Sequence, residues 1–253
     1  MKNKNKYRLL AISFCLLAIT LFSCKKKEYA PIYFGYDYFP NTLGHYTVYE
    51  CDSIIYNPYS AHKPQFDTTK YQIREVIDSI YTDNEGRPTM RVVRYRRPDS
   101  LTKTVPWSNI LIPEKVWKAN LLSNMAWRQE DNYEYVKLVF PMSLNEMWNG
   151  NSVNSLSAVN YQYTTLHTPY TLKINNSTGT VHFDSTLTVA QQKDSGLDFY
   201  QYYFEQYAAG YGLIHKVVID YAVSYLSTIP PKVDSANSGT IFYSETYLSS
   251  GNQ

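Results

Sequence analysis

The sequence predicts a mainly β protein: an antiparallel sheet, either curved into a half-barrel or stacked in two layers, with one or two short helices. Tyrosine and phenylalanine, which favour strands, number 26 and 10. Runs of β-forming residues recur along most of the chain, separated by turn signals rich in Pro, Gly, Asn and Asp. We expect a single β-rich domain over residues 38–253, preceded by a leader and a short tether.

The first three predicted strands are Tyr46–Tyr56, Tyr71–Tyr81 and Arg91–Arg97. Residues 83–88 have the composition of a hairpin turn, and Gly86 is the expected positive-φ residue. Arginines recur along the third strand and could bind an anion. Long cationic side chains more often cover a sheet face with their charges in water, and we favour that interpretation.

The middle of the chain is less regular. Glu114–Leu122 fits a short helix or a strand, whereas Trp127–Gln129 and Tyr133–Phe140 predict two strands around a turn at 130–132. The pentapeptide FPMSL at 140–144 repeats the spacing of FPNTL at 39–43. We interpret each as a proline-fixed turn that anchors one aromatic residue and one leucine in the core. The repeat suggests two similar halves that meet near residue 139.

Short β-forming runs continue to the C-terminus. Phe199–Tyr207 is the best helix candidate by composition, although its aromatic residues also permit a strand. A glycine-containing bend at 209–212 leads into a strongly alternating strand, Leu213–Tyr225. The other strand candidates in this part are Ser155–Leu166, Tyr170–Ile174, Val181–Val189 and Thr240–Tyr247.

The N-terminus carries the pattern of a lipoprotein signal peptide. A basic segment (2–8) precedes an apolar run of about 14 residues (9–22), which is too short to span a membrane as a helix. Leu21 and Ser23 stand three and one residues before Cys24, as a lipobox requires. We therefore expect residues 1–23 to be removed, Cys24 to carry the lipid, and residues 24–37 to form the tether.

Removal of the leader changes the charge and the cysteine content. The remaining 230 residues would hold 20 basic and 22 acidic side chains. That balance gives no concentrated basic face of the kind that binds nucleic acid. With Cys24 acylated, Cys51 would be the remaining thiol, without a partner for an internal disulfide. Its place in a predicted strand indicates a buried structural residue.

Three features together resemble uncharacterised envelope lipoproteins of Bacteroidota. They are the lipobox, the FPNTLG corner at 39–44 that enters a tyrosine-rich strand, and YAAGYGLI at 207–214. In those lipoproteins the corner more often carries Trp where Thr47 stands here. The resemblance implies an envelope-anchored β-rich domain, and it brings no catalytic residues.

The sequence carries no catalytic or metal-binding motif that stands out. None of the histidines, at 45, 62, 167, 182 and 215, is paired at metal-ligand spacing with Cys, Asp or Glu. The Ser-x-x-Lys spacing that begins at Ser60 lacks its companion motifs. We therefore expect no enzyme activity, no metal and no cofactor.

Asp-Ser or Asp-Thr followed by a small or aliphatic residue, or by Thr, recurs along the chain. The pattern is similar to the O-glycosylation acceptor of Bacteroidota envelope proteins, although ordinary turns and strand ends use the same dipeptides. The best-placed candidate acceptors are Thr68, Ser100 and Ser235.

Four tyrosines, Tyr200, Tyr203, Tyr207 and Tyr211, gather around the bend at 209–212. They form a candidate aromatic platform for a sugar ring or a protein partner, because tyrosine offers a large, rigid contact area. Packing within the sheet is the commoner role of such clusters.

The leading expectation for function is a non-catalytic envelope lipoprotein that binds a protein or glycan partner. The alternative is a carrier that encloses a lipid or another apolar ligand in a concave sheet. The membrane is reached through the N-terminal lipid, with the outer membrane facing the periplasm as the expected site. Surface export signals of such bacteria tend to be acidic just after the lipidated cysteine, and the lysines at 25–27 depart from that pattern. The cell surface is therefore only the second possibility.

Overall fold

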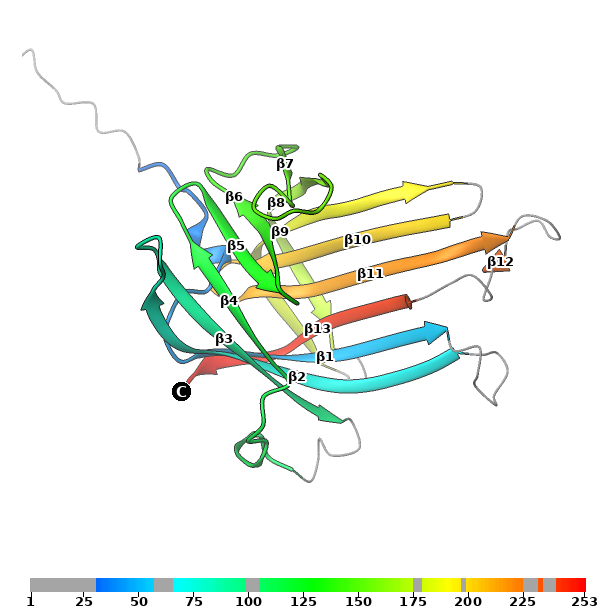
Figure 1. The fold of residues 1–253 in the computed structure, drawn as a ribbon, viewed down its shortest axis with the longest axis horizontal. Coiled ribbons are helices and arrows are strands. Elements are labelled where there is room, and N and C mark those ends of the chain that lie inside the picture. Colours follow the sequence, from blue (N-terminus) through cyan, green and yellow to red (C-terminus); the bar gives the residue numbers. More distant parts are fainter. Residues whose placement is uncertain are drawn as a thin grey trace, which may run out of the picture. The chain divides into compact units, whose positions relative to one another are not determined.

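The computed structural model describes residues 31–56, 66–98, 105–174, 179–196, 199–224, 232–233 and 240–253. Residues 34–253 form one compact unit. Within it, the described residues form a single sheet of 13 strands, and neighbouring strands pair antiparallel (Figure 1). The predicted mainly β, antiparallel curved sheet is confirmed, and the half-barrel alternative is the one that applies.

The strand order places early and late parts of the chain on opposite sides of a central pair. The strands are β1 His45–Tyr56, β2 Phe66–Thr82, β3 Pro88–Pro98, β4 Lys115–Leu121, β5 Met125–Glu130, β6 Tyr133–Val139, β7 Met147–Asn149, β8 Asn160–Lys173, β9 Thr180–Ser195, β10 Phe199–Ala208, β11 Gly212–Ser224, β12 Lys232–Val233 and β13 Thr240–Asn252. Their order is β6-β5-β4-β3-β2-β1-β13-β11-β10-β9-β8-β7, with β12 paired to β11. The chain changes sides between β6 and β7, and the similarity of the two halves stays a prediction.

Helical structure among the described residues is limited to two 3-10 turns, η1 Tyr36–Tyr38 and η3 Trp107–Asn109. Residues 115–121 form β4, so the strand alternative for Glu114–Leu122 is correct. The helix prediction for Phe199–Tyr207 is wrong, because these residues form β10 between β9 and β11. Aromatic side chains suit a strand that packs on both faces, and this context outweighs composition.

The first hairpin has the predicted turn. Gly86 has a φ of 77°, as expected for the turn that joins β2 to β3. The Asp83 carboxylate accepts hydrogen bonds from the backbone N–H groups of Glu85 and Arg87, both at 2.9 Å. Local hydrogen bonding of this kind is why Asp is common in turns.

The two proline corners bury their aromatic residue and expose their leucine. Phe39 and Phe140 lie in the same core cluster, whereas Leu43 and Leu144 are 58% and 55% exposed. The predicted anchoring of a leucine is therefore wrong at both corners. The burial of one large ring already fixes each turn against the core, since a phenylalanine buries far more apolar area than the turn itself.

Edge strand β6 is covered on the side that faces away from β5. The Val136 N–H donates to Gly150 O and the Val136 carbonyl accepts from Trp148 Nε1, both at 2.9 Å. The Tyr163 hydroxyl accepts a hydrogen bond from the Val139 N–H and donates one to the Val139 carbonyl, each at 2.9 Å. Gly150, Trp148 and Tyr163 therefore occupy backbone groups of Val136 and Val139 on an edge that no further strand of the described residues pairs.

Among the described residues, no helix is both long and apolar enough to cross a membrane.

Candidate functional site

Ion pairs connect strands of the first half of the sheet with strands of the second half. Lys137 of β6 places Nζ 2.9 Å from Glu205 Oε1 of β10, and Lys216 of β11 places Nζ 3.1 Å from Glu130 Oε2 of β5. Figure 1 shows β4 and β5 crossing the lengthwise run of β10 and β11. We call the face of the sheet that carries these four side chains the inner face.

The inner face carries a charge cluster with equal numbers of acidic and basic groups. Arg94 lies 2.6 Å from Glu245 and 3.2 Å from Glu75, and Lys137 is 2.9 Å from both Glu130 and Glu205. The cluster consists of Glu75, Glu130, Glu205, Glu245, Arg94, Arg128, Lys137 and Lys216. Its formal charge is therefore zero.

Basic neighbours keep the buried carboxylates ionised. Burial disfavours the charged form of Glu245, but Arg94 and Lys216 outweigh it and hold the pKa of Glu245 at about 2. Burial acts in the same way on Glu130 and Glu205, and the neighbouring lysines lower the pKa of both carboxyl groups. The cluster is thus a set of fixed, paired charges at neutral pH.

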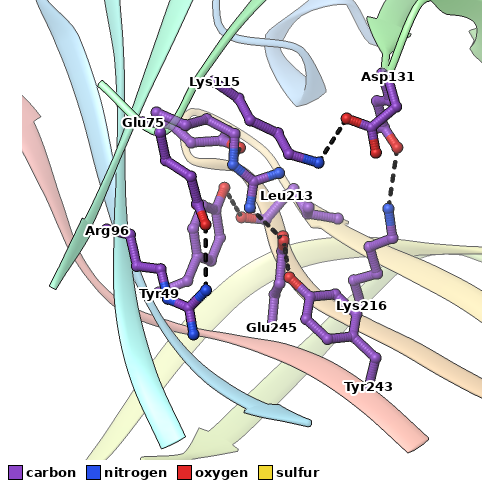
Figure 2. Close-up of polar contacts among 12 residues, drawn as sticks. Tyr49, Glu75, Arg96, Lys115, Asp131, Leu213, Lys216, Tyr243 and Glu245 are labelled. Atoms are coloured by element: carbon purple, nitrogen blue, oxygen red, sulfur yellow. Dashed lines mark hydrogen bonds and ion pairs between the residues drawn. The ribbon is translucent and has the colours of Figure 1, made fainter. Parts of the chain in front are cut away.

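Aromatic side chains enclose the charge cluster. The Tyr207 hydroxyl donates to Glu205 at 2.6 Å, and the Tyr243 hydroxyl donates to Glu245 at 2.5 Å. The Arg94 guanidinium lies 4.1 Å from the ring centre of Trp117. Figure 2 shows Tyr243 beside Glu245, with Lys115 and Lys216 directed toward the turn that carries Asp131. Aromatic side chains therefore contact both acidic and basic groups of the cluster.

The arginines of β3 divide between solvent and the interior. Arg91 and Arg96 are exposed, as the favoured interpretation expects. Arg94 and Arg97 are buried, which corrects that interpretation for these two residues. Arg94 pairs with carboxylates of the protein, and Arg97 donates to Val105 O at 2.6 Å and Gln72 Oε1 at 2.5 Å. Protein acceptors thus occupy the positions that an anion would take.

Beside the charge cluster lies a groove of about 320 Å³. Strands β8 to β11 contribute one side of its lining, while β6, the β5–β6 turn and the loop after β7 contribute the other. Its lining residues are Glu130, Asp131, Tyr135, Lys137, Asn151, Val159, Tyr161, Gln191, Gln192, Tyr203, Lys216 and Val218. We refer to this space as the groove.

A β-bulge in β9 directs two consecutive side chains to the groove. Phe204 of β10 pairs with Ala190 and Tyr203 pairs with Gln192, so Gln191 is the extra residue. Consecutive strand residues normally face opposite sides, whereas Gln191 and Gln192 both line the groove. Gln191 is 7% exposed, and its Nε2 has no hydrogen-bond partner among the described residues.

Next to the bulge, polar side chains form a row on β9, β10 and β11. Gln192 Nε2 donates to Gln201 Oε1 at 3.3 Å, and Gln201 Nε2 is 3.4 Å from the Asp220 carboxylate. The Tyr203 hydroxyl donates to the same carboxylate at 2.5 Å. Burial, followed by this hydrogen bond, raises the pKa of Tyr203, so its hydroxyl stays protonated.

The structure separates the four tyrosines of the predicted platform. Tyr203 lines the groove, and Tyr207 lies deeper on the same face, bonded to Glu205. Tyr200 is on the opposite face of β10, because side chains alternate along a strand. Tyr211 is in the turn after β10, where it packs edge-on against Phe183. Two of the four tyrosines therefore share a face, and the four do not form one surface.

The predicted modification sites are described in part. Thr68 is exposed on β2, where it pairs with Ile54 of β1. Cys24, Ser100 and Ser235 lie outside the described residues, as do residues 1–23. Cys51 is fully buried, as expected, and burial followed by the charge of Glu245 raises the pKa of its thiol.

One constellation has the residue types of a hydrolytic triad. His182 Nδ1 lies 3.0 Å from Thr171 Oγ1, and His182 Nε2 lies 3.5 Å from Asp184 Oδ1. The side chains of His182 and Asp184 are 59% and 101% exposed, whereas a triad acid is buried against its histidine. We interpret the three as side chains on a solvated strand face. Among the described residues, no group of three His, Cys, Asp or Glu could hold a metal ion.

Comparison with solved structures finds the crystal structure of a presumed exported protein with a YmcC-like fold from Bacteroides fragilis NCTC 9343. The two chains are 11% identical, and the alignment covers 85% of this chain and 98% of the other with a TM-score of 0.34. No protein-family model and no curated protein matches this chain. The functional proposal therefore depends on the residues of this chain alone.

Proposed function

We propose that this protein is a non-catalytic cell-envelope lipoprotein, lipid-anchored through Cys24 in the outer membrane and facing the periplasm. In this proposal its β domain binds a protein or glycan partner in the groove. The observation that carries the proposal is the β-bulge at Gln191, which places two glutamine side chains beside Tyr203 in a groove of about 320 Å³. Bulges are frequent next to functional sites, where they redirect a side chain.

The protonation states of the groove residues support a binding role over catalysis. A general acid or base works best with a pKa near the operating pH. Burial lowers the pKa of Lys137, but Glu130 and Glu205 outweigh burial and raise this pKa above its ordinary value. Basic neighbours lower the pKa of both glutamates. These shifts move each group away from neutrality, which suits fixed recognition.

The space inside the sheet argues against the carrier alternative. Two spaces, of about 60 Å³ and 240 Å³, lie against the charge cluster; the lining of the first includes Lys137 and Glu205, and that of the second includes Arg94, Lys216 and Glu245. Small-molecule sites usually measure about 300–1,000 Å³ and are mostly apolar. Both spaces are smaller than that range and are lined in part by charged groups, so they suit water molecules better than an acyl chain.

The anchor is tested by intact-mass spectrometry of the protein purified from its own membranes. We expect a chain that starts at Cys24 and carries acyl mass, because the lipobox directs cleavage before that cysteine. Cys24→Ala should retain the leader and lack the lipid. A wild-type protein of unlipidated mass would remove the anchor from the proposal. Additional sugar mass mapped to Thr68, Ser100 or Ser235 would identify a glycosylated site.

The binding role of the groove is tested by photo-crosslinking in the native host. We expect a product when Tyr203 is replaced by p-benzoylphenylalanine, because this side chain lines the groove. The matched control is the same replacement at Tyr200, on the opposite face of β10. Equal products from both positions, or none from position 203, would contradict binding in the groove.

A further inference from the structure

We propose that the groove is a saccharide site in which the Gln191 amide donates a hydrogen bond to a hydroxyl oxygen of a neutral sugar. This inference rests on the proposed binding function and names the class of ligand. It depends on three observations: a buried donor without a partner, a balanced set of charges, and polar aromatic walls.

The first observation is the state of Gln191. Its side chain is 7% exposed, lines the groove, and has an Nε2 with no hydrogen-bond partner among the described residues. A buried amide donor without an acceptor is costly, so a native protein retains one for a reason. Because the Gln191 side chain lines the groove, a ligand bound in the groove lies beside this amide group. A ligand oxygen there would supply the missing acceptor.

The second observation is the charge of the groove. Lys137 and Lys216 both lie within 3.4 Å of Glu205, and each also pairs with Glu130. Asp131 also lines the groove, and its exposed carboxylate pairs with Lys115 at 2.5 Å. A charged ligand would have to compete with these pairs and lose its own hydration. A neutral ligand does not compete with these pairs, and its desolvation costs less than that of an ion.

The third observation is the chemistry of the walls. Tyr135 and Tyr203 lie on different sides of the groove, and Gln192 and Asn151 bring further amide groups. An amide offers both donors and acceptors, which matches sugar hydroxyls, and tyrosine adds an apolar ring with a polar tip. The backbone groups of β10 are paired on both sides, so an extended peptide finds no open strand edge here. These features favour a saccharide over a peptide.

Saccharide binding is tested with full-chain protein in detergent and a panel of neutral trisaccharides: maltotriose, cellotriose, mannotriose and chitotriose. Saturation-transfer NMR and calorimetry should detect binding of at least one of them. Gln191→Met should then weaken the affinity about tenfold, since it removes one donor while keeping the length of the side chain. Tyr200→Phe, on the opposite face of β10, should leave the affinity unchanged.

The same variant gives a second measurement that does not depend on finding the ligand. Because Nε2 of Gln191 is buried without a partner, Gln191→Met should raise the melting temperature of the ligand-free protein by a few degrees. A residue retained for packing or hydrogen bonding within the fold would lower it. Gain of stability together with loss of binding is typical of a residue retained for a ligand.

Two results would overturn the inference. One is a Gln191→Met protein that melts below wild type, and the other is a panel in which no trisaccharide binds or in which Gln191→Met binds as well as wild type. If a protein crosslinks at position 203 while no trisaccharide binds, the saccharide inference fails and the proposed function stands. If nothing crosslinks at position 203, the proposed function fails as well.

Discussion

Replacing Lys137 by Met is expected to lower the free energy of unfolding by about 3–5 kcal/mol, the typical cost of removing one partner from a buried ion pair. The Lys137 side chain is 4% exposed, and its ammonium lies 2.9 Å from both Glu130 and Glu205. Without it, Glu205 keeps a buried negative charge with Lys216 as its nearest cation, at 3.4 Å. Urea unfolding at pH 7, followed by tryptophan fluorescence, measures the change.

Two further variants separate loss of the buried charge from loss of a lysine. Lys118→Met removes an exposed lysine of β4 and should change stability by about 0.5 kcal/mol or less. Lys137→Met combined with Glu205→Gln removes both charges and should recover part of the loss, because no unpaired carboxylate remains at that position. Equal effects of Lys137→Met and Lys118→Met would show that the ion pairs across the sheet do not stabilise the fold.

Acid is expected to destabilise the protein steeply between about pH 4.5 and pH 2. The folded-state pKa of Glu245 is about 2, below its ordinary value of 4.5. A lowered carboxyl pKa gives stability that is complete above the unfolded-state pKa and is lost as the pH falls through the folded-state value. The shift of Glu245 alone corresponds to about 3 kcal/mol of folding stability at neutral pH. Glu130 and Glu205 add to the effect, because their pKa values are lowered too.

The pH dependence is measured by urea unfolding at pH 7, 5, 4 and 3. Glu245→Gln provides the matched control, since it removes one titrating group and keeps the shape of the side chain. We expect this variant to be less stable than wild type at pH 7, because the buried Arg94 guanidinium loses its charged partner at 2.6 Å. Its stability should fall less steeply below pH 4.5. A wild-type free energy of unfolding that is unchanged from pH 5 to pH 3 would contradict the assignment of ionised carboxylates.

The sequence predicts most of the strands because aromatic and β-branched residues accumulate there. Tyr46–Tyr56 and Arg91–Arg97 coincide closely with β1 and β3. Phe199–Tyr207 is misassigned as a helix candidate, since local composition does not reveal that β10 pairs with strands on both sides. Strand order is also absent from local patterns, because the pairing of β1 with β13 joins the two ends of the domain.

The candidate site is less predictable than the fold. Glu205 alternates with Tyr203 and Tyr207, so the sequence does place an acid among residues of one strand face. The sequence around Glu205 does not show that this face is buried, because the lysines that neutralise Glu205 come from β6 and β11. Gln191 is harder still, because a bulge depends on the register of two strands and leaves no residue signature here.

The covering of β6 has a consequence for aggregation. An edge strand with open N–H and carbonyl groups is a template on which another chain can add a strand and begin aggregation. Here the Gly150 carbonyl, Trp148 and the Tyr163 hydroxyl occupy the groups of Val136 and Val139 that such a chain would need. Copies of the protein at high local concentration are therefore hindered from joining their sheets at these positions of β6.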